Sequence, residues 1–416
     1  MGLRTLVLLA LAALTLTACT AGNSRQACPA GKRCMLVGNG QDPTTLDPNK
    51  STGTWEDRII SDLNMGLIQD DAAGNSVPGL AQSWETSADG LTWTFHLRHD
   101  AKWSDGVPIT AGDFVFSLRR IMDPATASEY AYLISFIKGA QPIMAGQAKP
   151  ETLGVRAIDP YTLEIRLEHP APFLLELAKH TTMMPLPRHV VERWGAAWVQ
   201  PAHYVSSGAY RLVDWRLGNY IRVVKNPYFF DAATVCFDQI DYFPTIDSVA
   251  AERRVLSGEL DSNTDIASSR MARLRTNAPD YVHTHTYLGT SYMVFNSRIP
   301  ALRDRRVRLA IAMSIDREFI ANRLMVDGKV PAYTFVPPGI ANYTPPAPPV
   351  WSTWPFEKRL VEARRLLAEA GYTAARPLVL DMYHASNPDS ALVMQALQAD
   401  WARANIKVNL SQRDAA

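Results

Sequence analysis

The sequence lacks the motifs that mark the common classes of enzyme. Among its 416 residues there is no G-x-S-x-G nucleophile elbow, no H-E-x-x-H zinc motif, no P-loop, no G-x-G-x-x-G dinucleotide motif and no C-x-x-C pair. An excess of one charge is also missing, because 42 Lys and Arg stand against 41 Asp and Glu. This balance argues against nucleic acid or an anionic lipid surface as the main partner. We therefore expect neither a catalytic centre nor a nucleic-acid partner.

Long apolar runs are scarce as well, and the strong one lies at the N-terminus. Arg4 supplies a positive start, residues 6–16 form an apolar stretch, and small residues precede Cys19, which is the pattern of a cleavable export signal. The tetrapeptide Leu16-Thr17-Ala18-Cys19 resembles the lipobox of bacterial lipoproteins. We predict a signal peptide over residues 1–18 and lipidation of Cys19, with acyl chains as the only membrane attachment. An ordinary secretory signal with a chance cysteine is the alternative.

Cysteine is rare, and the pattern of the few that remain favours a disulfide over a metal site. Besides Cys19 the chain has Cys28, Cys34 and Cys236. In an oxidising compartment Cys28 and Cys34 can close a small loop, within a polar tether that we place at residues 19–34. No histidine or second cysteine pair lies near them at zinc spacing. Cys236 stands between Val and Phe, which predicts a buried free thiol.

Histidine offers one candidate metal pair. His283 and His285 are two residues apart, so in a strand they would share a face. Without a nearby carboxylate or third ligand, exposed strand histidines are the simpler interpretation. We expect no metal and no cofactor.

Hydrophobic periodicity predicts a mixed α/β protein. About 400 residues remain after the signal, which is too long for one core and indicates two or three domains. Alternating apolar residues predict strands, and apolar residues at helical spacing predict helices. The predicted strands are 91–97, 161–167, 220–224 and 406–410, and the predicted helices are 111–121, 304–325, 356–370 and 389–404. Strands in several separated clusters favour α/β lobes over a sandwich.

Six segments of the chain carry the most distinctive sequence. They are residues 77–128 (VPGLAQSWETSADGLTWTFHLRHDAKWSDGVPITAGDFVFSLRRIMDPATAS), SSGAYRLVDW (206–215), KNPYFFD (225–231), SGELD (257–261), RDRRVRLAIAMSIDREFI (303–320) and EARRLLAEAGY (362–372). Together they resemble the extracytoplasmic oligopeptide-binding proteins that serve ABC importers (bacterial solute-binding protein family 5). Their order and spacing match the family from about Leu36 to Leu410.

The resemblance implies a two-lobed periplasmic-binding-protein-like α/β fold of the class II type, with an extra domain inserted in the first lobe. Carried over by position, lobe I comprises residues 35–64 and 188–288, the inserted domain 65–187 and lobe II 289–416. The family continues beyond the position that corresponds to Ala416, so we expect lobe II to be incomplete in this sequence.

The resemblance also implies a function: capture of an oligopeptide and its delivery to the permease subunits of an ABC importer, with no reaction catalysed. The protein is then a monomer in the periplasm or at the cell surface, held to a membrane by its lipid anchor. Alternatives are another solute of the same superfamily, such as a cell-wall peptide, a nickel complex or an opine. An extracytoplasmic peptidase is a rival from a different class, which the missing nucleophile and metal motifs disfavour.

By position, eight residues correspond to the family's ligand-binding residues. Peptide backbone would pair with the segment Thr52-Gly53-Thr54, where Gly53 suits the close approach of another chain. Core packing is the alternative interpretation for the tyrosines and for the histidine. The other residues are Tyr130, His180, Tyr287, Tyr292 and Asp389.

Some of these positions depart from the family pattern. Asp389 replaces a histidine that helps to receive the peptide carboxylate, so a carboxylate here would repel a C-terminus unless a cation intervenes. Thr264 and Asp265 replace a Tyr-Asn pair, and Val294 replaces a glutamate. We expect these changes to alter the preferred peptide length or terminus.

Overall fold

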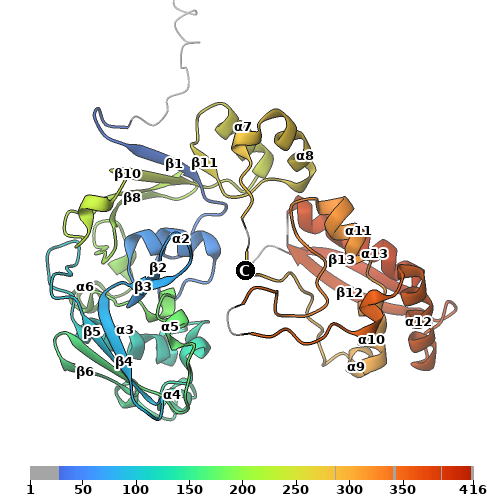
Figure 1. Cartoon of the computed structure of the whole chain (residues 1–416), viewed down its shortest axis with the longest axis horizontal. Coiled ribbons are helices and arrows are strands. Elements are labelled where there is room, and N and C mark those ends of the chain that lie inside the picture. Colours follow the sequence, from blue (N-terminus) through green and yellow to red (C-terminus); the bar gives the residue numbers. More distant parts are fainter. Residues whose placement is uncertain (1–27, 286, 341–342, 386, 414–416) are drawn as a thin grey trace, which may run out of the picture. The chain divides into compact units, whose positions relative to one another are not determined.

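The computed structural model describes residues 28–285, 287–340, 343–385 and 387–413 (Figure 1). The chain divides between Asp265 and Ile266 into two compact units, each treated by itself below. The cysteine predicted to carry lipid, Cys19, and the predicted signal peptide lie outside the described residues. Among the residues that are described, no helix combines the length and apolarity needed to cross a membrane.

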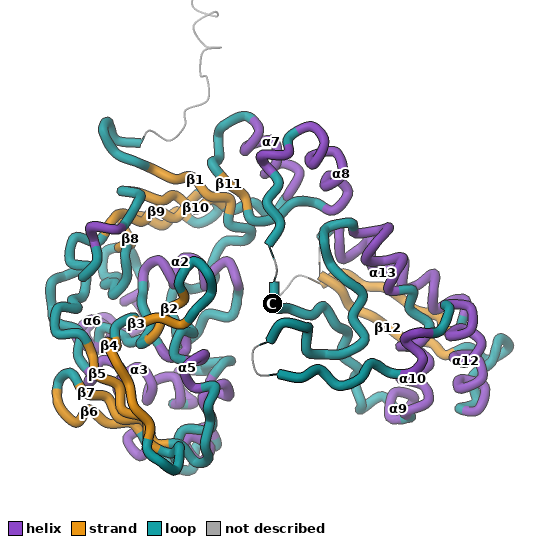
Figure 2. The backbone as a smooth tube through the Cα atoms, viewed as in Figure 1, coloured by secondary structure: helices purple, strands orange, loops and turns teal. Residues whose placement is uncertain are grey.

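The first unit contains a five-stranded sheet built from two separate stretches of sequence (Figure 2). Its order is β11-β1-β10-β9-β8, and β1 pairs in parallel with both β10 and β11 while the remaining pairs are antiparallel. Apolar side chains of the sheet pack with helix α2 into one core. The strands are β1 Cys34–Gly38, β8 Tyr210–Arg216, β9 Tyr220–Lys225, β10 Gln239–Phe243 and β11 Ser262–Asn263, and the helices are α2 Thr54–Leu63, α6 Arg188–Trp194, α7 Ser248–Leu256.

A four-stranded antiparallel sheet, order β4-β5-β7-β6, forms a second core in the same unit. The predicted alternation over 91–97 is confirmed, because Trp93, Phe95 and Leu97 are buried while His96 is exposed. The elements are β2 Ile68–Asp70, β3 Ser76–Pro78, β4 Ala81–Thr86, β5 Thr92–Leu97, α3 Ala111–Met122, α4 Ala140–Met144, β6 Val155–Asp159, β7 Thr162–Arg166 and α5 Leu174–Leu177.

The second unit packs helices against the parallel pair β12 and β13. Leu378, Ile406 and Val408 of these strands are buried with Trp401, whose indole N–H donates to the Ile311 carbonyl at 3.2 Å. The elements are α8 Ser268–Asn277, α9 Pro300–Arg303, α10 Arg305–Met313, α11 Arg317–Phe319, a π-helical turn Ile320–Met325, α12 Phe356–Glu369, β12 Leu378–Ala385, α13 Pro388–Arg403 and β13 Ile406–Arg413.

The prediction of a single helix over 304–325 is wrong, because helix α10 ends at Met313 and two shorter helical segments follow. The Ser314 hydroxyl donates to the Ala310 carbonyl at 2.7 Å, and Asp316 then caps a new helix by accepting from the Phe319 N–H at 3.1 Å. The Asp316 N–H donates to the Asp400 carboxylate at 2.8 Å. Side-chain hydrogen bonds of Ser and Asp compete with helical ones, which explains the break at this point.

Two further expectations are also corrected. Residues 282–285 form no strand, so His283 and His285 do not lie on a sheet; both are exposed, and His283 Nε2 contacts the Asp280 carbonyl at 3.1 Å. In the described ranges no three His, Cys, Asp or Glu side chains are arranged to hold a metal. Cys236 is a free thiol, as predicted, but it is exposed and not buried. It lies in the loop before β10, where the Arg33 guanidinium is 3.7 Å from the Cys236 Sγ.

The small cysteine loop lies at the start of β1. Cys28 and Cys34 are joined by a disulfide with their Cα atoms 5.7 Å apart. The loop is tied to the sheet through Asp238, which accepts from the Arg33 N–H at 2.9 Å and pairs with Lys32 at 3.3 Å. Of the tether predicted over residues 19–34, the described residues 28–34 therefore form a disulfide-closed loop that is hydrogen-bonded to the sheet.

Candidate functional site

The segment Thr52-Gly53-Thr54 leads directly into helix α2. Gly53 is the N-cap residue and has extended backbone angles, φ −94° and ψ 145°. Thr52 and Thr54 are exposed, and Gly53 is half-buried. The segment is therefore accessible, and an extended residue at its centre is compatible with backbone pairing.

Two predicted residues from distant parts of the sequence lie beside this segment. The Tyr130 hydroxyl donates to the Thr52 carbonyl at 3.1 Å, and the rings of Tyr130 and His180 are 5.8 Å apart between centroids. Partial burial raises the pKa of Tyr130, so its hydroxyl stays protonated near neutral pH. Unit 1 thus brings Thr52, Gly53, Thr54, Tyr130 and His180 together.

His180 is held in one tautomer. The Thr182 N–H donates to its Nδ1 at 3.3 Å, and the Thr182 hydroxyl lies 3.1 Å from the same atom. Because Nδ1 accepts from a backbone N–H, the proton of the neutral ring is assigned to Nε2. Burial lowers the pKa of His180, and the nearby Asp57 carboxylate opposes this only in part. Near neutral pH the ring is an uncharged donor through Nε2.

The first turn of α2, which follows the segment directly, carries two carboxylates, Glu56 and Asp57, that the sequence reasoning missed. Asp57 has its pKa raised by burial, against the lowering effects of His180 and Arg58. Glu56 is 2% exposed and accepts hydrogen bonds from the Thr52 and Gly53 N–H groups, both at 3.0 Å. A Glu at the third helical position is the usual sign of such a cap and was the available signal.

Gly53 has a packing reason that the sequence does not reveal. A Cβ at this position would lie 2.6 Å from Cε2 and 2.8 Å from Cζ2 of Trp55, so the indole covers the glycine. The backbone angles of Gly53 are open to any residue, so its conformation does not require glycine. The small residue makes room for a neighbouring ring of its own chain.

The remaining predicted residues, Tyr287, Tyr292 and Asp389, belong to unit 2. Tyr287 is 82% exposed, and Tyr292 is exposed with its ring against Phe335, 4.9 Å between centroids. Asp389 accepts from the Ser268 hydroxyl at 2.7 Å and from its N–H at 3.4 Å. The carboxylate of Asp389 therefore has a structural partner at the start of helix α8.

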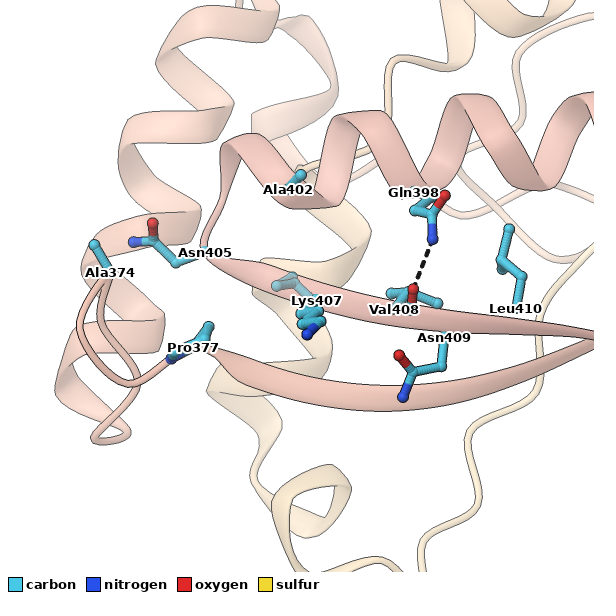
Figure 3. A pocket seen from close by; sticks show the side chains of 10 residues that line it. Ala374, Pro377, Gln398, Ala402, Asn405, Lys407, Val408, Asn409 and Leu410 are labelled. Atoms are coloured by element: carbon cyan, nitrogen blue, oxygen red, sulfur yellow. Dashed lines mark hydrogen bonds between the residues drawn. The ribbon is translucent and has the colours of Figure 1, made fainter.

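Unit 2 also contains a cavity of about 600 Å³ between α13 and β13 (Figure 3). Gln398 crosses it and donates from Nε2 to the Val408 carbonyl at 2.7 Å. The cavity is lined by the polar residues Asn405, Lys407 and Asn409 and by small or apolar residues such as Ala402 and Leu410. None of the eight residues predicted to bind the ligand lines this cavity.

Comparison with known proteins agrees with this architecture. The chain is 40% identical over 413 residues to the periplasmic oligopeptide-binding protein OppA of Escherichia coli, covering 96% of this chain and 75% of the relative. Haemophilus influenzae OppA in complex with RPPGFSPFR has a similar structure, with a TM-score of 0.84, 33% identity and coverage of 92% of this chain and 76% of that one. The murein tripeptide-binding protein MppA of Escherichia coli has a TM-score of 0.87 at 33% identity, again covering 92% and 76% of the two chains.

These similarities confirm the predicted two-lobed α/β fold class. The family model of bacterial extracellular solute-binding proteins, family 5 middle region, matches residues 75–416, which is most of the chain. The protein therefore acts outside the cytoplasm, as such proteins do. The chain belongs to family 5 of the bacterial extracellular solute-binding proteins.

Proposed function

We propose that this protein captures oligopeptides outside the cytoplasm and delivers them to the permease of an ABC importer, without catalysing a reaction. The observation that carries the proposal is the cluster of Thr52, Tyr130 and His180, which gathers neutral polar groups at an exposed, extended segment. Relatives named for oligopeptide binding, one of them solved with a nonapeptide, support the same ligand class.

The groups in this cluster suit a peptide main chain. The Thr52 carbonyl is an acceptor, while the Tyr130 hydroxyl and the Nε2–H of His180 carry no charge. Neutral donors and acceptors pair with amide groups irrespective of side chains, which is how strand-like recognition achieves tolerance of sequence. Water can fill the space around varied side chains at little cost.

The same proposal places the protein at a membrane surface as a monomer. Lipidation of Cys19 would hold it there, because each buried CH₂ of an acyl chain contributes about 0.8 kcal/mol. The lipobox-like tetrapeptide that ends at Cys19 supports this anchor.

A cell-wall peptide is the second candidate ligand. The similarity to the murein tripeptide-binding protein, with a TM-score of 0.87, supports it. A murein tripeptide shares main-chain amides with ordinary peptides, so the Thr52 cluster can serve both. The two differ in their termini and side chains, which an experiment can separate.

Native mass spectrometry of the exported protein tests the proposal. The protein is mixed with tetraalanine, murein tripeptide and free alanine, and the bound masses are read directly. We expect an intact peptide in a one-to-one complex. His180→Ala should weaken this complex, whereas His189→Ala, which removes an exposed histidine paired with Asp105 at 2.7 Å, should not. Cleaved product would indicate a peptidase, and absence of any peptide complex would overturn the proposal.

A further inference from the structure

The buried carboxylate of Glu56 accepts hydrogen bonds from the two segments that precede helix α2, residues 44–45 and 52–53. Glu56 Oε2 accepts from the Thr52 and Gly53 N–H groups, both at 3.0 Å. Its Oε1 accepts from the Thr44 N–H at 2.7 Å, the Thr44 hydroxyl at 2.6 Å and the Thr45 N–H at 3.4 Å. Burial alone would raise the pKa of Glu56, but these hydrogen bonds together hold it below its ordinary value. Glu56 is therefore a carboxylate held by neutral donors.

These bonds decide which backbone groups face outward. With their N–H groups donated to Glu56, Thr52 and Gly53 have none to offer a ligand. The Gly53 carbonyl accepts from the Glu56 and Asp57 N–H groups at 3.2 and 3.0 Å. What remains is the Thr52 carbonyl, which has a second lone pair beside its Tyr130 bond, and the Thr54 N–H, for which the described residues supply no acceptor.

The two remaining groups have the geometry of a strand edge. Because Gly53 is extended, the carbonyl that precedes it and the N–H that follows it point to the same side of the chain. The Gly53 N–H points to the opposite side, where Glu56 receives it. A peptide main chain can pair with both groups at once, donating one N–H to Thr52 and accepting at one carbonyl from Thr54.

We propose that Glu56 is the positioning residue for peptide capture: it turns two N–H groups inward and so presents the Thr52 carbonyl and the Thr54 N–H as a two-point backbone receptor. This inference rests on the proposed function. The residue touches no ligand itself. Glu56 acts by orienting the segment 52–54, and the groups that this segment presents bind main-chain amides and not side chains.

A capping carboxylate without this role provides a matched control in the same unit. Asp113 is the third residue of helix α3 and accepts from the Thr110 N–H at 2.8 Å and the Thr110 hydroxyl at 3.1 Å. It is buried, as Glu56 is. Asp113 interacts with Thr110, Trp103 and Arg188 and with no residue of the segment 52–54 in the described structure, whereas Glu56 holds that segment and also reaches residues 44 and 45.

The test compares wild type, Glu56→Gln and Asp113→Asn by calorimetry with tetraalanine and with tetraalanine methylated at each amide nitrogen in turn. In wild type, methylation of the one amide that faces the Thr52 carbonyl should weaken binding about tenfold. Glu56→Gln has one acceptor oxygen for donors that bind both oxygens of the carboxylate, so its NH2 group must face N–H or O–H donors on one side. It should therefore weaken tetraalanine about tenfold or more and bring the methylation ratio close to one. Asp113→Asn should keep the wild-type affinity and ratio.

The methylation ratio separates positioning from simple instability. A loss of folded protein weakens all the peptides equally and leaves their ratio unchanged. An unchanged ratio in folded Glu56→Gln would overturn the inference while leaving the proposed function intact, whereas a wild type that binds no peptide would overturn both. If Glu56→Gln does not fold, Thr44→Val decides the question, because it removes only the 2.6 Å hydroxyl bond. Its ratio should fall between wild type and one, and a wild-type ratio would contradict the inference.

Discussion

Replacing Gly53 by alanine tests the packing of Trp55 against the α2 entry. The added Cβ would lie 2.6 Å from the indole, closer than side-chain carbons approach, so the ring must move. In a Trp55→Ala background the same methyl group meets no ring. We therefore expect Gly53→Ala to destabilise the wild type more than it destabilises the Trp55→Ala variant.

The expected size follows from several effects. Gly→Ala at a backbone open to all residues stabilises by about 0.4–1 kcal/mol, because the unfolded chain loses freedom. Gly53 is also the N-cap of α2, where glycine is preferred over alanine, and this offsets the gain in both backgrounds. Overpacking costs about 1–3 kcal/mol, and a half-buried ring such as Trp55 can shift, which favours the lower end. The coupling free energy between positions 53 and 55 should equal the overpacking cost, about 1–2 kcal/mol.

Hydrogen exchange measures this coupling locally. A chain of two units need not unfold in a single step, so the free energy of opening is read from the amides of Ile59, Ile60 and Leu63 in α2. Equal destabilisation by Gly53→Ala in both backgrounds would refute the packing argument. Tetraalanine binding is measured in parallel: we expect Trp55→Ala and the double variant to bind equally, and a further loss in the double variant would restore close ligand approach as the reason for glycine.

Four further predictions concern the protonation of His180, the lipidation of Cys19 and the disulfide. Burial lowers the pKa of His180 in the folded protein, so the contribution of this residue to stability should be complete above the unfolded pKa of 6.5. The contribution should decrease as the pH falls from there through the folded pKa. Hydrogen exchange at several pH values should show this decrease, and the same decrease in His180→Gln would assign it to another group. Protonation also places an Nδ1–H against the Thr182 N–H, so tetraalanine affinity should fall over the same window. Cys19→Ser should leave an uncleaved precursor that takes up no labelled palmitate, and continued labelling would exclude this lipid site. Cys28 and Cys34 should resist alkylation without reductant in the exported protein, and two reactive thiols found by mass spectrometry would contradict the disulfide.

Local sequence patterns predicted most individual elements. Alternation over 91–97 and the helical stretches 356–370 and 389–404 correspond to β5, α12 and α13 within one or two residues. Gly371 has φ +89° just after α12, a conformation that favours glycine and ends the helix. The pattern over 304–325 failed because apolar spacing alone does not report the hydrogen bonds of Ser314 and Asp316, which interrupt the helix.

The sequence by itself predicted a mixed α/β fold through its periodicity, and its resemblance to a known family supplied the family and the candidate ligand residues by position. Tertiary structure decided the interactions of those residues. Only folding shows that Trp55 covers Gly53, that Thr182 sets the tautomer of His180 and that Ser268 holds Asp389. The physical reason is that hydrogen bonds and ring contacts need specific directions and distances of a few ångströms, which residue spacing in a sequence does not specify.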